Sequence, residues 1–80
     1  MKTTAYFRHT RTRRDRAWIR YEWIERALRT PVATRIQTDG RVRRWAWIEE
    51  TGKFLRVVTL ADGETVHNAF FDKDFREEET

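Results

Sequence analysis

The fold of this chain is decided by Asp39-Gly40 and the run that follows it, Arg41-Val42-Arg43-Arg44-Trp45-Ala46-Trp47-Ile48. A type I′ hairpin turn needs positive φ at its central residues, which an Asp-Gly pair supplies, so residues 41–48 are predicted to form the second arm of a β-hairpin. The β-branched and aromatic residues of the run suit a pleated, half-buried surface. If the tryptophans face outward beside the arginines, they form a stacking platform for nucleic acid. If they face inward, the arginines alone make the site.

Four strand-like runs are separated by short loops that each contain glycine. The loops are Asp39-Gly40, Glu50-Thr51-Gly52 and Asp62-Gly63, with glycine where positive φ is wanted. Loops this short make consecutive strands antiparallel neighbours, so the runs are predicted to form a β-meander. The four predicted strands are Val32–Thr38, Arg41–Glu49, Lys53–Leu60 and Glu64–Phe71.

The residues before the sheet have a helical pattern. Residues 5–16 are predicted as a short helix, and residues 19–29 as an amphipathic helix whose apolar arc includes Trp23 and Ile24. Pro31 ends this helix because the residue before a proline is pushed out of the α region.

Together these elements predict a single α+β domain over residues 1–80. One or two N-terminal helices, at about 5–30, pack on one face of a four-stranded antiparallel β-meander, at about 32–71. The acidic tail, residues 72–80, is expected to fray.

Length and composition limit the class of protein. A chain of 80 residues buries only about 60–65% of the surface of its unfolded state, so its stability depends on large side chains such as the four Trp and five Phe. The chain has no cysteine, which excludes disulfides and thiolate metal sites. No apolar run approaches the roughly 18 residues of a transmembrane helix, and the first residues lack the apolar core of a signal peptide. We therefore expect a soluble, cytoplasmic protein with no membrane partner.

The net charge of +4 hides an asymmetry along the chain. Residues 1–44 carry thirteen Lys and Arg against four Asp and Glu, a net +9, whereas residues 45–80 carry four against nine, a net −5. Fourteen of the seventeen cations are arginine, which makes bidentate contacts with phosphate and stacks on bases. This balance favours an anionic partner, either RNA or an acidic protein segment. A solvated arginine-rich surface with no partner is the alternative.

Loop lengths predict which side chains share each face of the sheet, because register follows loop length. Two-residue turns at residues 39–40 and 62–63 and a three-residue loop at residues 50–52 give one coherent apolar face. Since the helical arc must cover an apolar face, the tryptophans of this face are expected in the core. The predicted members are Val32, Ile36, Trp45, Trp47, Leu55, Val57, Thr59, Val66 and Phe70.

The opposite face is predicted to gather basic side chains. Arg35 lies directly across from Arg44 in this register, and like charges that face each other across a strand pair cost stability unless an anion relieves them. Arg56 and His67 join them on the same face. The cluster depends on the loop at residues 50–52, because a two-residue loop there swaps the faces of the last two strands.

The order of several motifs resembles that of a known family. The first motif is His9…Arg16-x-x-Ile19-x-x-Glu22-x-Ile24-Glu25-x-Ala27-Leu28-x-x-Pro31, and the later ones are Asp39-Gly40-Arg41, Leu55-Arg56-Val57-Val58 and Ala69-Phe70-Phe71-Asp72. In this order and spacing, over roughly residues 6–75, the chain resembles the small domain-of-unknown-function relatives of the RelE and BrnT toxins.

The resemblance implies the same helix-then-sheet fold. For the toxin members it implies ribonuclease activity or inhibition of translation through basic residues on the open sheet face, with RNA or the ribosome as target and an antitoxin-like protein as partner. RelE-type catalysis uses basic and sometimes tyrosine side chains near the last strands and the C-terminus. This chain instead ends in an acidic run, and its tyrosines, Tyr6 and Tyr21, lie in the helical part. No catalytic residue is therefore carried over, and His9 and Arg16 match the family pattern by position only.

RNA cleavage requires a base for the 2′-hydroxyl, an acid for the leaving oxygen and cations for the phosphate. His67 and Arg56 are the candidate catalytic residues because both are predicted on the basic face, whereas His9 is predicted to be structural. No metal site is indicated, since the histidines and carboxylates lack ligand spacing, and no cofactor motif is present. The candidate anion-binding residues are Arg13, Arg16, Arg35, Arg44 and Arg56.

The sequence supports three functional hypotheses. The first is a metal-independent, toxin-type protein that acts on RNA or translation through the basic face. The second is a non-catalytic module of the same fold that binds RNA or an acidic partner there. The third is a structural domain whose acidic tail covers its own basic surface.

Overall fold

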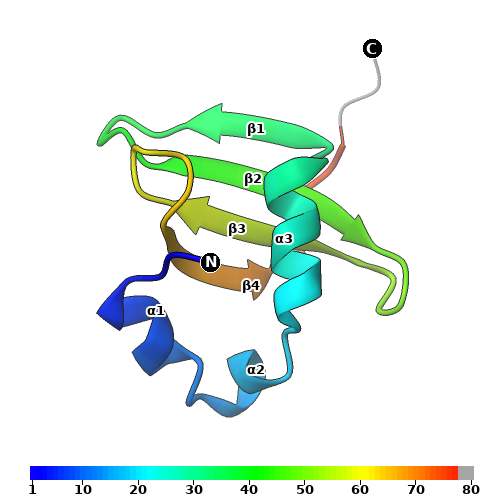
Figure 1. The fold of residues 1–80 in the computed structure, drawn as a ribbon. Helices are drawn as coiled ribbons and strands as arrows, with labels where there is room; N and C mark the ends of the chain where they lie inside the picture. The colour runs from blue at the N-terminus through cyan, green and yellow to red at the C-terminus, as the bar shows by residue number, and fades with distance from the viewer. Residues whose placement is uncertain (78–80) are drawn as a thin grey trace.

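The computed structural model describes residues 1–77, in which three short helices precede a four-stranded antiparallel sheet (Figure 1). The strands lie side by side in chain order, so the predicted α+β architecture and β-meander are confirmed. No helix in this part of the chain is long and apolar enough to cross a membrane. The elements are α1 (Ala5–Thr10), α2 (Arg14–Ala17), α3 (Tyr21–Arg29), β1 (Ala33–Ile36), β2 (Val42–Ile48), β3 (Lys53–Thr59) and β4 (Val66–Phe71).

Local chemistry explains where the helices begin and end. Thr4 caps α1, because its hydroxyl accepts a hydrogen bond from the backbone N–H of Phe7 at 3.1 Å. Helix α3 carries Glu22 in its first turn and Arg29 in its last, which complements the helix dipole. It ends at Arg29, two residues before Pro31, as predicted.

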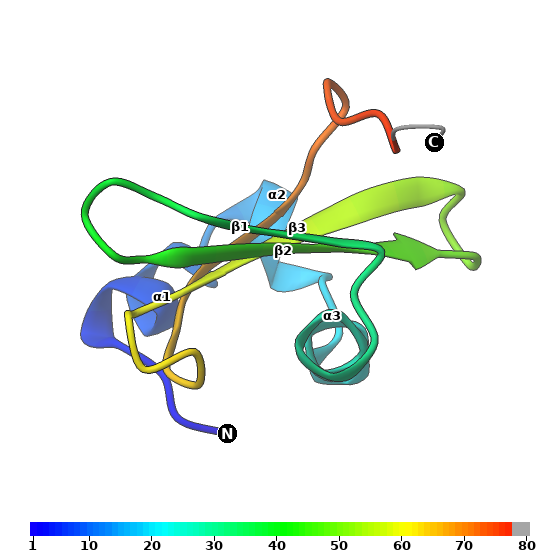
Figure 2. The same cartoon turned by 90° about the horizontal axis from the view of Figure 1, so that it is seen from above.

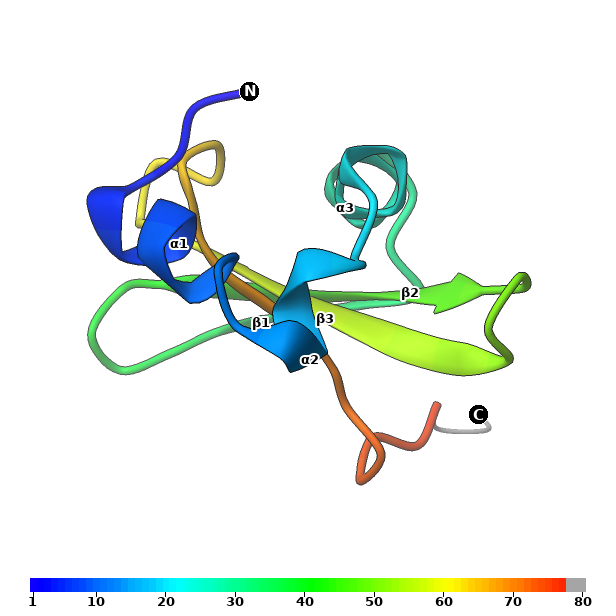
Figure 3. The same ribbon diagram turned by 90° about the horizontal axis from the view of Figure 1, so that it is seen from below.

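Helices α1 and α3 lie on one face of the sheet, and the C-terminal segment lies on the other (Figures 2 and 3). We call these the helix face and the open face. The core lies between the helices and the helix face, and burial of each large aliphatic side chain there contributes about 1.5–3 kcal/mol. The core residues are Phe7, Ile19, Trp23, Ile24, Ala27, Ala46, Ile48, Leu55, Val57, Val66 and Ala69.

The β1–β2 hairpin is one residue out of the predicted register. Gly40 has a positive φ of 91°, whereas Asp39 does not. The N–H of Gly40 donates to the Gln37 carbonyl at 2.9 Å, which closes a three-residue loop with a left-handed glycine at its end. Thr34 consequently pairs with Arg44, whereas the two-residue turn predicted that it pairs with Trp45.

The β2–β3 loop is also one residue longer than predicted. Ile48 pairs with Lys53, so the loop holds four residues, 49–52. The N–H of Gly52 donates to the Ile48 carbonyl at 2.9 Å, and the positive φ of this glycine, 65°, lets the chain reverse. The side chains of β2 and β3 that share a face of the sheet are therefore different from those predicted.

Both tryptophans of β2 face away from the helices, so the predicted core was wrong on this point. Trp45 lies opposite Arg56 on the open face, and Trp47 is 42% exposed on the same face. One extra residue in a loop changes the register by one, and each such change sends alternate side chains to the other face. The helix face of these two strands carries Val42, Arg44, Ala46, Ile48, Leu55, Val57 and Thr59.

The β3–β4 hairpin keeps the predicted pairing beside its turn and loses it farther along. Thr59 pairs with Val66, as predicted, but a β-bulge follows. The extra residue of the bulge is His67, and Asn68 then pairs with Val58, whereas the loop lengths predicted that it pairs with Val57. Asn68 therefore lies on the open face, away from the apolar core.

The segment after β4 folds back over the open face. The N–H of Asp72 donates a hydrogen bond to β3 at 2.9 Å, and the ring of Phe75 stacks on Trp45. Asp72 and Phe75, in the tail that was expected to fray, thus pack on the sheet, whereas residues 73, 74, 76 and 77 are exposed and residues 78–80 lie outside the described part of the chain.

Candidate functional site

The open face contains a polar hollow of about 470 Å³ beside the β-bulge, which we call the His67 hollow. Side chains from α1, the β1–β2 loop, β3 and β4 meet in it. None of its described lining residues is a carboxylate, although Arg41 lies 3.7 Å from Asp39 and Arg56 lies 3.5 Å from Asp72, both outside the lining. Those residues are Tyr6, Gln37, Arg41, Arg56, Val58, His67, Asn68 and Phe70.

The bulge and the N-terminal segment hold His67 at one side of this hollow. Its Nδ1 lies 3.1 Å from the hydroxyl of Thr4, whose own N–H donates to the Val66 carbonyl at 3.0 Å. Its ring stacks on Tyr6 with 4.7 Å between centroids. Burial, followed by the nearby charge of Arg41, lowers the pKa of His67 below its ordinary value of 6.5. The imidazole is therefore neutral at pH 7 and can accept a proton.

Arg56 lies between two aromatic rings on the open face. Its guanidinium carbon is 5.5 Å from the ring centroid of Trp45 and 5.0 Å from that of Phe70. Its Nε is 3.5 Å from the Asp72 carboxylate, an ion pair without hydrogen-bond geometry, so this buried atom has no hydrogen-bond partner among the described residues. Burial, followed by repulsion from Arg43, lowers the pKa of Arg56. An anion at this position would stabilise the arginine.

Helix α2 brings Arg16 to the far side of Phe70. A guanidinium nitrogen of Arg16 donates to the side-chain oxygen of Asn68 at 2.8 Å, and its carbon is 5.1 Å from the Phe70 ring centroid. The anion-binding residue predicted at position 16 therefore lies beside the hollow. Arg13, predicted with it, is exposed at the start of α2 and does not line the hollow.

A second hollow of about 410 Å³ adjoins the first and shares Arg56 and Phe70 with it. We call it the Trp45 hollow. Arg35 lies across from Arg43 on its sheet side, and the Arg35 guanidinium is 5.9 Å from the Trp45 ring centroid. The described lining of this hollow is Arg35, Arg43, Trp45, Arg56, Phe70, Asp72, Asp74, Phe75 and Arg76.

Arg44 is absent from both hollows because it lies on the helix face, so its predicted place was wrong. Its guanidinium donates to the Gly63 carbonyl at 2.8 Å. Arg43 takes its place opposite Arg35, as the three-residue loop requires. A glycine preceded by two turn residues, Thr38-Asp39, is the sequence signal that could have indicated this register.

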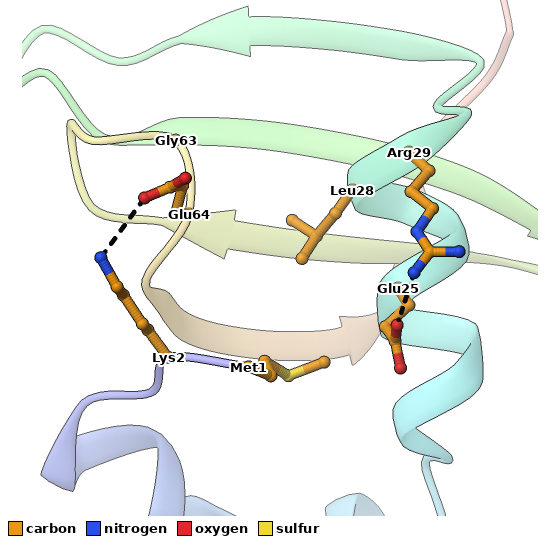
Figure 4. Close-up of a pocket in the computed structure, with 7 residues that line it drawn as sticks. All are labelled: Met1, Lys2, Glu25, Leu28, Arg29, Gly63 and Glu64. Atoms are coloured by element: carbon orange, nitrogen blue, oxygen red, sulfur yellow. Dashed lines mark hydrogen bonds and ion pairs between the residues drawn. The ribbon is translucent and has the colours of Figure 1, made fainter.

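Another hollow, of about 510 Å³, lies on the helix face between α3 and the N-terminal segment (Figure 4). Its charged side chains pair with one another. Lys2 lies 3.4 Å from Glu64, and Arg29 lies 3.1 Å from Glu25. The lining of this hollow therefore carries both signs of charge, whereas the charged residues that line the His67 hollow are all basic.

Within residues 1–77, no group of three or more His, Asp and Glu side chains is placed to hold a metal ion. The RelE and BrnT resemblance stays a prediction, because comparisons of the chain with protein-family models, with curated proteins and with solved structures find no match.

Proposed function

We propose that this protein binds single-stranded RNA through the open face of its sheet. A row of alternating arginine and aromatic side chains crosses this face, and it is the observation that carries the proposal. Successive members lie 5.1, 5.0, 5.5 and 5.9 Å apart, measured from guanidinium carbon to ring centroid. The row runs Arg16, Phe70, Arg56, Trp45, Arg35.

The alternation of cations and rings matches a single strand of nucleic acid. Arginine contacts phosphate through two N–H groups at once, and unpaired bases stack on aromatic rings. Bases inside a duplex are already stacked and cannot reach such rings. An acidic protein segment would satisfy the arginines but has no group that needs Phe70 or the half-exposed Tyr6. The row therefore favours RNA over an acidic protein.

Salt dependence tests this proposal. Contacts between three or four arginines and phosphates predict that log K falls with log salt with a slope of about −2 to −3 for a single strand. We expect this slope from fluorescence anisotropy of a labelled RNA of about 12 nucleotides, a length within the range of single-strand site sizes. Duplex RNA and polyglutamate should compete weakly. A flat salt response, or equal competition by polyglutamate, contradicts the proposal.

Cleavage of the bound RNA is a second candidate function, favoured by the meeting of His67, Arg41 and Arg56 in one hollow. A neutral His67 can take the proton of a 2′-hydroxyl, whose oxygen attacks the phosphorus as the bond to the 5′-oxygen breaks, and the leaving 5′-oxygen takes a proton from water. The two arginines can stabilise the phosphate in the transition state. This chemistry needs no metal and corresponds to the toxin-type activity that the family resemblance implies. An antitoxin-like protein that covers the open face would then be the expected partner.

The state of the RNA after incubation distinguishes the two functions. A ribonuclease of this kind leaves a 2′,3′-cyclic phosphate even in the presence of a metal chelator, and we expect His67→Gln to lose cleavage while it keeps RNA binding. Burial lowers the pKa of His67, so this base stays unprotonated to a lower pH than an ordinary histidine does. Cleavage should therefore decline only in the acidic range, where His67 becomes protonated. If the RNA is still intact after prolonged incubation with the wild type, cleavage is wrong and RNA binding remains as the proposed function.

A further inference from the structure

We infer that Trp45, one ring of this row, is a nucleobase site on the RNA-binding face, and that the protein's own C-terminal segment occupies it, with Phe75 in the place of a base and Asp72 in the place of its phosphate. The inference rests on the proposed function, and it assigns a role to the Trp45 end of the row and names a competitor for that position. The ligand is an unpaired nucleotide of the same RNA strand.

Phe75 covers Trp45 in the manner of a stacked base. The two rings are nearly parallel, with 4.7 Å between centroids and 16° between planes. Phe54 closes the edge of this stack, at 5.0 Å from Phe75. Trp45 is consequently only 3% exposed, although Trp47 on the same face of the same strand is 42% exposed. The sheet therefore presents a flat aromatic platform, and Phe75 of the tail covers it together with Arg35 and Arg56, whose guanidinium carbons lie 5.9 and 5.5 Å from the ring centroid.

Asp72 holds the position of a phosphate beside that platform. Its carboxylate accepts a hydrogen bond from the indole N–H of Trp45 at 3.0 Å and lies 3.5 Å from Nε of Arg56. The second contact is incomplete, because that buried Nε has no hydrogen-bond partner among the described residues. A phosphate has more acceptor oxygens than a carboxylate and can satisfy both donors. An incoming nucleotide thus has a stabilising interaction to gain over the tail.

The Trp45 hollow is continuous with the proposed RNA path. It shares Arg56 and Phe70 with the His67 hollow, so a strand that follows the row of rings and arginines reaches Trp45 next. The tail places Asp72 and Asp74 among the arginines of this hollow, where they lower its positive charge. The tail and the RNA strand therefore compete for the same platform and the same cations.

Phe75→Ala in the full chain tests the inference. Removal of the phenyl ring uncovers Trp45 without any change in charge, and base stacking on the free ring should tighten binding of single-stranded RNA about 5- to 10-fold. An abasic oligonucleotide of the same length should gain little, because it has phosphates but no bases. Tyr21→Ala, an exposed ring in α3, is the matched control and should bind like the wild type.

A second variant tests the position assigned to phosphate. Asp72→Asn keeps an acceptor for the Trp45 indole and removes the charge facing Arg56, so RNA binding should tighten about 2- to 3-fold. Glu64→Gln removes the same charge on the helix face, where Glu64 pairs with Lys2, and should have less effect. Equal effects of the two variants would show that net charge, and not this position, controls binding.

The outcomes separate the inference from the proposed function. If the wild type binds RNA with the expected salt slope but Phe75→Ala binds no tighter, the nucleobase site at Trp45 is wrong and the proposed function is retained. An equal gain for the RNA and the abasic oligonucleotide also overturns the site. If neither the wild type nor Phe75→Ala binds RNA, the proposed function itself fails.

Discussion

Ala46→Glu is expected to unfold the protein, whereas Trp47→Ser is expected to leave it folded. Ala46 is 1% exposed on the helix face, across from Leu55, and a carboxylate there has neither space nor a partner. Burial of an unpaired polar or charged group costs several kcal/mol, a large part of the roughly 4–12 kcal/mol typical of an 80-residue domain. Trp47 instead lies on the open face with its ring against Phe54, and its loss should cost about 1 kcal/mol.

Urea denaturation followed by circular dichroism measures both effects. The comparison also tests the register of β2, because the register predicted from loop lengths places Trp47 in the core and Ala46 outside it. Unfolding by Trp47→Ser together with a stable Ala46→Glu would show that the faces of β2 are the reverse of those described.

The double variant Arg41→Ala/Arg56→Ala is expected to weaken RNA binding about 30- to 160-fold, which corresponds to about 2–3 kcal/mol. Both side chains line the His67 hollow, and each charged hydrogen bond to a phosphate contributes about 1–1.5 kcal/mol after the exchange with water. Loss of two phosphate contacts should also make the salt slope about 1.4 less steep. Anisotropy titrations at several salt concentrations measure both quantities.

A variant with the same change in charge controls for non-specific attraction. Arg20→Ala/Arg29→Ala removes two arginines that pair with Glu22 and Glu25 at α3, far from the open face. We expect it to bind RNA nearly as the wild type does. Arg44→Ala should behave likewise, since this arginine lies on the helix face. A loss of binding in these variants equal to that of the double variant would mean that net charge, and not the hollow, attracts the RNA.

The elements and their order could be predicted from the sequence because their signals are local. Glycine at positions 40, 52 and 63 marks the three reversals, and each of these glycines does have positive φ. Pro31 ends α3, and the apolar arc containing Trp23 and Ile24 is buried. Short loops then leave antiparallel neighbours as the only arrangement.

The faces of the sheet could not be predicted from the same signals. Asp39-Gly40 suits a two-residue turn, yet Thr38 joins it in a three-residue loop, and Glu49 similarly joins the loop that ends at Gly52. A difference of one residue is small in local energy, but it moves every side chain of a strand to the other face. In the observed register α3 packs on Ala46, Ile48, Leu55 and Val57, and these contacts between distant segments are not specified by the loop residues.

For the candidate site, too, the sequence indicated the residue types, whereas the register decided which of them lie together. The residue types came from the sequence: Arg35, Arg56 and His67 were predicted on the basic face, and Arg16 was predicted as an anion-binding residue of the N-terminal helix. The structure places these four beside one row or hollow. The exchange of Arg44 for Arg43 followed from the register alone.

What the sequence by itself determined is the set of elements, their order and the excess of arginine before β2, because propensity, turn chemistry and charge are properties of short segments. Tertiary structure decided that Trp45 faces the open side and that Asp72 and Phe75 cover it. These contacts join residues 27 or more positions apart, and no local pattern specifies them. They form because the register of the folded sheet places the Trp45 ring and Arg56 on the open face, where the segment after β4 crosses the sheet.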